Sequence, residues 1–473
     1  MHKYSISIMA IFVAAGLLAG CGGSGALSTT GSSSAAGASP TVVTVGDAPM
    51  SSVLAALVTI SGVTFTSASG SVSLLQQPRT VELTHLGGIR APLELKPLAA
   101  GTYTSMSITV SAATITYIDP TTGQPVTAKA TIPAAAATDT ITLNPPLQVS
   151  AQGATDVRFD FDLQSSLDLT GSTVTFTPKI GGAATSVESE DDDQRSVHVD
   201  GTVSAVDTTA NTIAIKAGDS GLNVTLHVTS DTEFDDNVSL ATLQVGTQID
   251  TVDRLNVDGS LTALKIEDTD GGTEENQQGD IDGGIVTAVT RDSQNQLTSF
   301  TMVIRDSLDF DTLGQTLTVE VNSGTVFKDS MMAQAAGLAS YDQSSIFVGQ
   351  GVWVAGTAVQ TASSTVLATE IRPAAVSPFG LTSAAVQAAA NGGFTITLLL
   401  DNQTSFDKFA GLTTLTVETN ASTEFDGNGL TSTTVASLPA GTPLVARGYL
   451  AAVSSASGSS DVLFCTFLRE ESH

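Results

Sequence analysis

The sequence predicts an all-β protein in which one larger N-terminal domain is followed by three copies of a small barrel. Short runs of alternating apolar and polar residues recur between turn residues, whereas apolar stripes with helical spacing are scarce. One phrase also occurs three times, as SDTEFDDN from Ser230, SGTVFKDS from Ser323 and ASTEFDGN from Ala421. The alternation predicts strands, and the recurring phrase predicts a repeated domain.

The first residues predict export of the chain. Lys3 precedes the apolar run ISIMAIFVAAGLLAG, which ends at Cys21. This order is typical of a signal peptide, here residues 1–20. The tetrapeptide LAGC that ends at Cys21 resembles the lipobox of bacterial lipoproteins. The resemblance implies cleavage before Cys21, lipidation of its thiol with chains such as palmitate, and anchoring in a membrane. The alternative is an ordinary secretory peptide with an incidental cysteine.

The residue after the cysteine indicates where the anchor lies. In lipoproteins of this kind an aspartate at that position favours the inner membrane, and Gly22 stands there instead. The resemblance therefore implies the outer membrane or the cell surface. Residues 21–40 are rich in Gly and Ser and are expected to form a flexible tether. No other run approaches the roughly 18 apolar residues that a membrane helix needs.

The first block of short strands spans residues 41–182. It contains DAP at Asp47, LAAGTY at Leu98, DFD at Asp160 and FTP at Phe176. In order and spacing these motifs resemble an uncharacterised family of bacterial lipoprotein domains, although Ala replaces the proline usual in the second motif. The resemblance implies a β-sandwich and carries no activity with it.

Two acidic segments of the first half invite a functional interpretation. Alternation in RFDFDL places Asp160 and Asp162 on one face of a strand, where they form either an acid pair or a solvated face. The second interpretation is favoured because acid–base catalysis needs a cleft and a shifted pKa. Residues 183–196 are acidic and poor in apolar residues, which is typical of a solvated linker rather than a calcium site.

The three repeats span residues 197–269, 280–374 and 378–470. Each opens with two strands, continues with a third that ends in T-x-F, and resumes after a variable insert with a glycine and two more strands. Five strands with a segment of variable length after the third follow the order of an OB-like barrel, in which that segment is either a loop or a helix. The repeats also resemble a second exported domain family of unknown function, with G-x-V-x-x-V, T-x-F and V-G-x-x-V motifs. The expected fold is therefore an N-terminal β-sandwich followed by three OB-like five-stranded β-barrels.

The repeated phenylalanine is interpreted as a plug for one end of each barrel. Phe234, Phe327 and Phe425 share the parity of the buried positions in the preceding strand. Burial of such a side chain contributes about 2 to 3 kcal/mol. A polar turn follows each phenylalanine and is expected to face water.

Composition excludes several classes of function. The net charge of −29 repels phosphate backbones, so nucleic acid is not an expected partner. If Cys21 carries lipid, Cys465 has no mate for a disulfide. No His or Cys spacing typical of a metal site occurs, the Asp-rich turns lack the pattern of an EF-hand, and no phosphate loop is present, so neither a cofactor nor a metal is predicted. A weak calcium site remains an alternative at the acidic turns.

The tetrapeptide GDSG at residues 218–221 resembles the nucleophile loop of chymotrypsin-like proteases. It falls in a predicted turn between two strands, and the upstream histidines, His85 and His198, have no recognisable context of a catalytic base. His227 lies out of phase with its apolar neighbours and is expected to be solvated. No catalytic residue is predicted.

Trp353 is the candidate binding residue. Alignment of the fourth strands on Gly246, Gly349 and Gly441 places Trp353 in the same column as Asp250 and Val445. Alternation turns this column away from the barrel core. The only tryptophan of the chain is therefore expected to contact either another domain, which is favoured, or a ligand.

Anchor, tether and repeats together predict a non-enzymatic cell-envelope protein. Its β-domains are expected to form an array that binds a protein or another envelope component. A carbohydrate-binding surface lipoprotein is the first alternative, disfavoured by the scarcity of Trp and Tyr. A hydrolase is the second, disfavoured by the lack of a catalytic triad or metal ligands.

Overall fold

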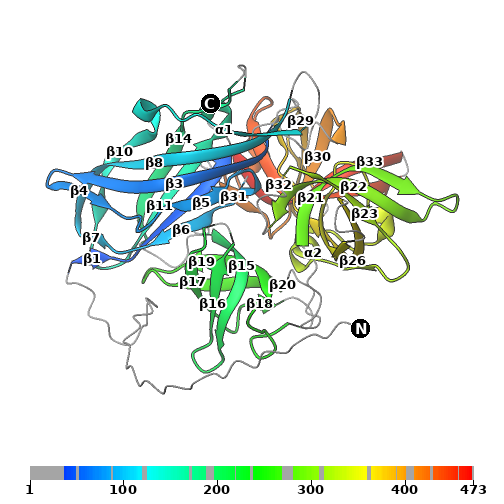
Figure 1. The fold of residues 1–473 in the computed structure, drawn as a ribbon, viewed down its shortest axis with the longest axis horizontal. Helices are drawn as coiled ribbons and strands as arrows, with labels where there is room; N and C mark the ends of the chain where they lie inside the picture. Colours follow the sequence, from blue (N-terminus) through cyan, green and yellow to red (C-terminus); the bar gives the residue numbers. More distant parts are fainter. Residues whose placement is uncertain are drawn as a thin grey trace, which may run out of the picture. The chain divides into compact units, whose positions relative to one another are not determined.

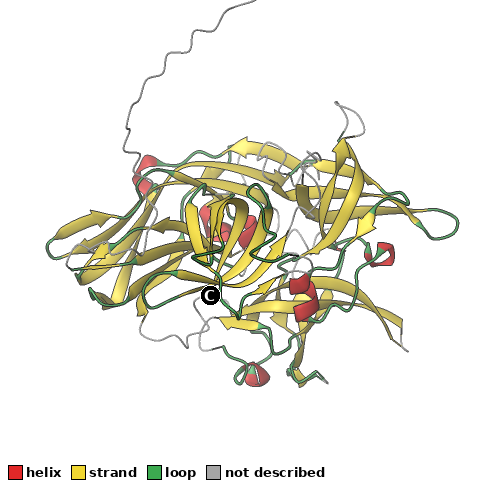
Figure 2. Cartoon of the chain, turned by 90° about the horizontal axis from the view of Figure 1, so that it is seen from below, coloured by secondary structure: helices red, strands yellow, loops and turns green. Residues whose placement is uncertain are grey.

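The computed structural model describes residues 37–48, 53–86, 89–119, 125–169, 173–187, 196–218, 220–234, 238–268, 281–307, 314–358, 364–389, 391–400, 410–426, 430–455 and 458–470. The predicted signal peptide and Cys21 lie outside these residues, as does most of the tether. The described chain is built almost entirely of strands, with a few short helices (Figures 1 and 2). This confirms the predicted fold class. No helix among the described residues has the length and apolar character needed to cross a membrane.

The N-terminal domain contains two sheets. The first pairs its strands in the order β10-β8-β3-β4, with β5 on β3 and β9 on β8; the bounds are β3 (Val53–Ser67), β4 (Gly70–Ser73), β5 (Arg79–Glu82), β8 (Gly101–Ile118), β9 (Pro125–Lys129) and β10 (Thr138–Val149). The second has the order β14-β11-β2-β6, with β2 (Thr41–Ala48), β6 (Ala91–Leu95), β11 (Ala154–Asp162) and β14 (Ile180–Val187). Small pairs and helices complete the domain: β1 (Ala38–Ser39) with β7 (Leu98–Ala99), β12 (Leu167–Asp168) with β13 (Thr175–Phe176), η1 (Thr84–Leu86), η2 (Ala134–Ala136) and α1 (Leu163–Ser166).

One core fills the space between these sheets. Val58 and Ile108 of the first sheet belong to the same buried cluster as Val45, Phe159 and Phe161 of the second. Alternation along each strand turns these apolar side chains inward and the intervening polar ones outward. The domain is therefore a β-sandwich.

The sandwich extends beyond the expected range of 41–182 at both ends. The strand β14 runs to Val187, inside the expected linker, and β15 of the first barrel begins at Ser196. At the other end β1, inside the expected tether, pairs with β7.

Each of the three repeats is a closed barrel of five main strands. The first strand pairs with the second and the fourth, the fifth pairs with the fourth, and the third and fifth run parallel. In barrel 3 the first strand, β27, pairs with β29 as its second main strand. This is the strand order of an OB fold.

The barrels differ mainly in their short elements. Barrel 1 consists of β15 (Ser196–Asp207), β16 (Thr212–Ala217), β17 (Asn223–His227), β18 (Glu233–Phe234), β19 (Gln248–Leu255) and β20 (Leu261–Asp268). Barrel 2 consists of β21 (Ile281–Arg291), β22 (Leu297–Ser307), β23 (Thr316–Glu320), β24 (Val326–Phe327), α2 (Met331–Ala336), η5 (Gln343–Ser345), β25 (Gly351–Ala358) and β26 (Thr365–Ala374). Barrel 3 consists of β27 (Phe379–Thr382), β28 (Gln387–Ala388), β29 (Phe394–Leu400), β30 (Thr414–Glu418), β31 (Glu424–Asp426), η6 (Val435–Ser437), β32 (Pro443–Ser455) and β33 (Gly458–Glu470).

A glycine in the first strand lets each barrel close. A Cβ on Gly201 would stand 2.2 Å from the carbonyl oxygen of Lys216, and the corresponding distances at Gly284 and Gly380 are 2.4 and 2.6 Å. In each case the obstacle is the backbone of the second strand. No larger residue fits there without a backbone shift.

A second glycine precedes the fourth strand. Gly246, Gly349 and Gly441 have φ values of 101°, 93° and 87°, which favour glycine. The N–H of each donates to a carbonyl of the first strand, at 2.8, 2.8 and 2.7 Å. The alignment of the fourth strands made from the sequence therefore holds in the structure.

The threonine of T-x-F joins the third strand to the fifth. The hydroxyl of Thr232 donates to the carbonyl oxygen of Ala263 at 2.7 Å, that of Thr325 to Ala368 at 2.8 Å, and that of Thr423 to Cys465 at 2.8 Å. Each hydroxyl also accepts the N–H three residues earlier in the chain, at 3.0, 3.1 and 2.9 Å respectively.

The carbonyl that each threonine contacts lies directly before an irregularity in the fifth strand. Register shifts leave Leu264, Thr369 and Thr466 without a partner on the fourth strand, so each barrel has a bulge at the same place. The threonine hydroxyl therefore supplies a hydrogen bond beside an interruption of the ladder.

The plug interpretation of the phenylalanine needs a correction. Phe234, Phe327 and Phe425 pack against the cores of their barrels but are only partly buried. Their backbones form short parallel pairings with the fifth strand, because the threonine two residues earlier brings the chain there. The repeated phrase thus serves the fold, and its most regular contacts come from threonine.

Candidate functional site

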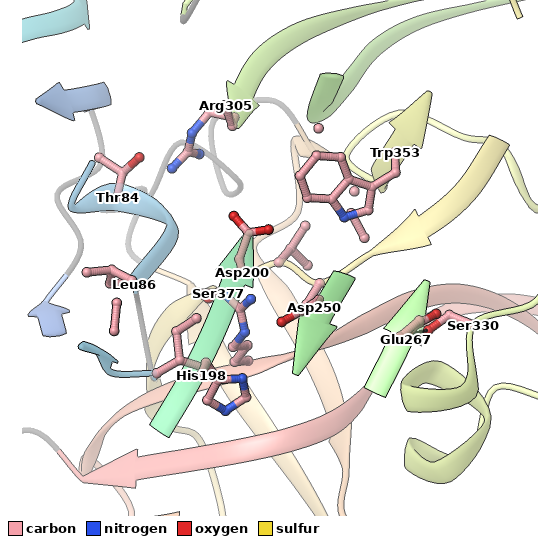
Figure 3. A pocket seen from close by; sticks show the side chains of 18 of the residues that line it. Thr84, Leu86, His198, Asp200, Asp250, Glu267, Arg305, Ser330, Trp353 and Ser377 are labelled. Carbon is pink, nitrogen blue, oxygen red and sulfur yellow. Dashed lines mark hydrogen bonds between the residues drawn. The ribbon is translucent and has the colours of Figure 1, made fainter. Parts of the chain in front are cut away.

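A cavity of about 150 Å³ lies where the sandwich and the three barrels meet (Figure 3). The sandwich contributes β5, η1 and the start of β6, and barrel 1 contributes β15, β16, the turn after β16, β19 and β20. Barrel 2 contributes β21, β22, the residue before α2, β25 and β26, and barrel 3 contributes β32. Residues far apart in the sequence therefore form one lining.

Three acidic residues form a row across barrel 1. Asp200 of β15 pairs with Asp250 of β19, and Asp250 pairs with Glu267 of β20. The neighbouring column contains Ile249, whose side chain is fully buried in the barrel core, so the acidic side chains point outward. All three line the cavity (Figure 3).

Three arginines from the other two barrels line the same cavity. Arg305 lies on β22, Arg372 on β26 and Arg447 on β32. Arg372 is buried and donates hydrogen bonds to the carboxylate of Glu370 and to the carbonyl of Asp268. The acidic row and these arginines balance in formal charge.

Trp353 lines the cavity from barrel 2. It pairs with Gly283 on β21 and with Arg372 on β26, and it is half-buried. Its neighbour Val352 is fully buried in the barrel core, so the indole points away from that core. Figure 3 shows the ring on the same side of the cavity as Arg305, with Asp200 between them and His198.

His198 lines the cavity from β15. Its backbone N–H donates to the carbonyl of Arg90 at 2.8 Å, which joins barrel 1 to the sandwich. Burial, followed by the positive charges of Arg447, Arg90 and Lys265, lowers the pKa of His198 to about 3. The imidazole is therefore neutral at neutral pH.

A buried chain of hydrogen bonds joins the three barrels beside the cavity. Ser330 donates to the Glu267 carboxylate at 3.0 Å and accepts the N–H of Ala333 at 3.1 Å, which caps α2. The Tyr449 hydroxyl is bonded to Ser330, and burial raises the pKa of Tyr449. Because Glu267, Ser330 and Tyr449 come from barrels 1, 2 and 3, this chain fixes their joint.

The two acids of the sandwich strand have structural partners. Phe159 and Phe161 are buried, and Asp160 and Asp162 point to the other face, as alternation predicts. Asp160 accepts a hydrogen bond from Arg469 of β33 at 3.0 Å, and Asp162 caps α1 by accepting the N–H of Ser165 at 2.9 Å. These contacts account for both carboxylates without a catalytic role.

The GDSG tetrapeptide lies in the turn between β16 and β17. Ser220 contributes to the cavity lining, and its carbonyl accepts a hydrogen bond from Arg79 of the sandwich at 3.1 Å. Within the described residues, the ring of His198 makes no hydrogen bond to a serine or an acid. In the same part of the chain no cluster of three or more His, Cys, Asp and Glu residues suits a metal ion.

The sequence alignment of the fourth strands places Asp250 at the position of Trp353, but only the tryptophan is predicted from the sequence as a site residue. Asp200 and His198 were not singled out as site residues, although Asp200 directly precedes the first-strand glycine of its barrel. A count of charged residues beside the motif glycines would have identified this residue. The three arginines of the lining do not lie beside a motif glycine, so the same count would not have identified them. Cys21, the other predicted site residue, lies outside the described residues.

Comparison with known families finds two matches, in the order expected from the motifs. Residues 40–178 match the model of a domain of unknown function, DUF4382. Residues 200–267 match that of another domain of unknown function, DUF5666. The first corresponds to the sandwich and the second to barrel 1. No curated protein matches the chain.

Solved structures with similarity to the chain include two forms of a single-stranded DNA binding protein from Thermus aquaticus. A deletion mutant of that protein is 12% identical, covers 41% of this chain and 94% of its own, and has a TM-score of 0.17. The wild type is 11% identical, covers 41% and 92%, and has a TM-score of 0.16. Drosophila Unr CSD456 is 12% identical, covers 58% and 98%, and has a TM-score of 0.14.

Proposed function

We propose that the protein is a non-enzymatic, lipid-anchored protein of the cell envelope whose joined β-domains bind a protein or another envelope component. The observation that carries the proposal is the joint of four domains around one cavity. Hydrogen bonds from His198, Ser330 and Arg372 join barrel 1 to the sandwich and to barrel 2. The side-chain amide of Gln350 donates to the carbonyl of Leu450 at 3.3 Å and joins barrel 2 to barrel 3, so the lining is held by all the domains together. A preorganised concave surface of this kind favours binding.

The proposed location follows from the N-terminal sequence. The LAGC tetrapeptide and Gly22 support a lipid anchor at Cys21 in the outer membrane or at the cell surface. A Cys21→Ser change should leave unprocessed precursor and abolish labelling with radioactive palmitate, since only the thiol accepts the lipid. Labelling that survives the change would contradict the proposed anchor.

Binding is tested by retention of envelope components on the immobilised protein. The intact chain should retain at least one component at physiological salt. The control is the Gly284→Ala chain, in which barrel 2 is expected to be disrupted. Equal retention by both chains, or by neither, would rule out the joined domains as a specific binding unit.

Nucleic acid is not a proposed partner. OB folds bind single strands on the second and third strands, with aromatic side chains and positive charge. Here threonines face outward on these strands, for example Thr301 opposite Thr318 and Thr397 opposite Thr416. The net charge of −29 removes the gain from counterion release. We expect no binding of a single-stranded DNA oligomer at physiological salt, measured by fluorescence anisotropy.

Carbohydrate binding is the second candidate function. The observation that favours it is the combination of an indole ring with carboxylates and guanidinium groups in one cavity. A hydrolase stays disfavoured, because Ser220 and His198 line the cavity without a hydrogen bond between them among the described residues.

A further inference from the structure

We propose that the four-domain cavity binds one neutral sugar ring, either a free monosaccharide or the terminal unit of an envelope glycan. This inference rests on the proposed binding function and names the class of ligand. The lining unites Trp353, the acidic row of barrel 1 and arginines of barrels 2 and 3 (Figure 3).

The size of the cavity sets the first limit. Its volume is about 150 Å³. An engineered cavity of about the same volume holds one benzene molecule. The ligand is therefore about one six-membered ring with small substituents, and a longer chain would have to place only its end there.

The charge of the lining sets the second limit. Asp200, Asp250 and Glu267 present carboxylate oxygens to the cavity in addition to the contacts that they make within the protein, and a carboxylate only accepts hydrogen bonds. The guanidinium groups of the lining also have partners in the protein, and they only donate. A ligand with several hydroxyl groups suits both kinds of group, because each hydroxyl donates one hydrogen bond and accepts others. A ligand with a net charge would disturb the balance between acids and arginines in a confined space.

The tryptophan supplies the third element. The indole of Trp353 is half-buried and points into the cavity from β25. A flat aromatic face suits the apolar C–H face of a pyranose ring, while the polar groups contact its edge. The neutral imidazole of His198, at the far side in Figure 3, adds a group that can donate and accept without adding charge.

A zwitterion of amino-acid size is the closest competitor, since its ammonium suits the acids and its carboxylate suits the arginines. The tryptophan argues against it, because a zwitterion as small as glycine has no apolar face to pack on the indole, whereas a pyranose ring has one. Asp200 and Asp250 are directly opposed on adjacent antiparallel strands, so their carboxylates face one region together. Two adjacent hydroxyls on a ring match this arrangement.

The experiment uses the only tryptophan of the chain as the reporter. The full mature protein, in a detergent without a sugar head group, is titrated separately with methyl α-D-glucopyranoside, N-acetylglucosamine, galactose and glycine while tryptophan emission is measured. At least one neutral sugar should give a saturable change, and glycine should give none. Saturation by glycine alone, or no response to any probe, would overturn the inference.

Two variants test whether the acids hold the sugar. Asp250→Asn keeps the shape of the side chain and removes its charge, so affinity should fall at least tenfold. Glu320→Gln, at an exposed position of β23, makes the same chemical change away from the cavity and should bind as the parent does. Melting curves verify that both variants are folded; if Asp250→Asn unfolds, Asp200→Asn replaces it. Unchanged affinity in a folded cavity variant would contradict the assignment.

Two further measurements distinguish a glycan from a free sugar, and failure of the sugar inference from failure of the proposed binding function. Tighter binding of an oligosaccharide than of its own terminal monosaccharide indicates a glycan, and equal binding indicates a free sugar. In the retention assay, an excess of the best monosaccharide should displace the envelope component. Retention that no sugar displaces would sink the sugar inference and leave the proposed binding function standing.

Discussion

Barrels 1 and 2 have the same backbone plan but differ at two positions of the fourth strand. They share the first-strand glycine, the turn glycine with positive φ and the threonine bonded beside the bulge. At the outward position barrel 1 has Asp250 where barrel 2 has Trp353. At the bulge it has Asp253 where barrel 2 has Gly356. The shared residues provide the space and the hydrogen bonds that the backbone of each barrel needs. The residues that differ determine the charge and the shape of the outer face and of the core.

The difference at the outward position extends to the first strand, which lies next to the fourth. Trp353 lies opposite Gly283, while Asp250 lies opposite Asp200. A glycine opposite the indole leaves room for a large ring, and an acid opposite an acid concentrates charge. The same column therefore gives one barrel an aromatic surface and the other an anionic one, and both line a single cavity.

The inward difference places an acid in a barrel core. Asp253 is fully buried, and the Thr251 hydroxyl lies 2.7 Å from one of its oxygens and 3.0 Å from the carbonyl of Val199. A hydroxyl has one proton. If it donates that proton to Val199, it accepts one from a protonated Asp253. This agrees with burial as the main cause that raises the pKa of Asp253.

The largest expected loss of stability comes from a substitution at the first-strand glycine that both barrels share. Gly284→Ala places a Cβ 2.4 Å from the carbonyl oxygen of Val303, so barrel 2 should lose more than about 3 kcal/mol of stability. Gly324→Ala is the matched control, because its Cβ would meet only the flexible side chain of Asn322, at 3.2 Å. Urea unfolding measures both. Similar midpoints would mean that the first-strand glycine does not serve barrel closure.

The second effect concerns the buried acid. A raised pKa means that the folded state holds the Asp253 proton above pH 3.8, the ordinary value, while the unfolded state releases it. Stability is therefore complete below that pH and falls as pH rises, by up to about 1.4 kcal/mol per pH unit until the folded group ionises.

Asp253→Asn cannot ionise and should remove this dependence. The variant should equal the parent near pH 4 and exceed it at pH 8, as measured by urea unfolding across that range. A parent that is no less stable at pH 8, relative to the variant, would show that Asp253 is ionised and solvated. An Asp207→Asn variant, at an exposed turn, controls for the loss of one negative charge.

The third effect concerns the threonine of the repeated phrase. Thr325→Val keeps the shape of the side chain but removes the hydroxyl that donates to Ala368 and accepts from Asn322. Loss of these bonds should cost about 1 to 3 kcal/mol. Thr325→Ser retains the hydroxyl and should cost less. Equal melting temperatures for the two variants would assign the role of the phrase to the phenylalanine instead.

The fold was largely predictable because its signals are local. Strand alternation, the positive-φ glycines and the repeated phrase each act within a few residues, so the alignment of Trp353 with Asp250 could be made before the structure. The role of threonine was not predictable, because its partner lies in the fifth strand beside a bulge. A bulge depends on pairing between strands, which alternation along one strand does not reveal.

The cavity was beyond the sequence for a related reason. Its lining joins Asp200, Arg305 and Arg447, which are separated by whole domains. The residues that pack between domains do not recur at a fixed spacing in the sequence. Complementary charges on different barrels therefore cannot be matched from the sequence alone. Only the outward direction of Trp353 pointed to this region.

The smallest expected effect concerns His198, in the wall of the cavity. Its pKa of about 3 in the folded protein, against an ordinary 6.5, means that the unfolded state binds more protons between these values. Stability is therefore complete above pH 6.5 and falls as pH drops. The side chain is only half-buried, so cavity water screens much of the penalty, and we expect a loss of about 1 kcal/mol between pH 7 and pH 5.

A His198→Gln variant isolates this loss from the titration of the many carboxylates. Glutamine keeps the polar character of the wall and does not titrate, so the difference in unfolding free energy between parent and variant should change by that amount over the same pH range. His227→Gln on β17 makes the same chemical change outside the cavity lining and is the matched control. A profile that is the same for His198→Gln and the parent would mean that the imidazole becomes protonated in the folded protein at ordinary pH. The cavity would then gain a positive charge beside Arg447, and the balance of acids and arginines on which a neutral ligand depends would no longer hold below pH 6.5.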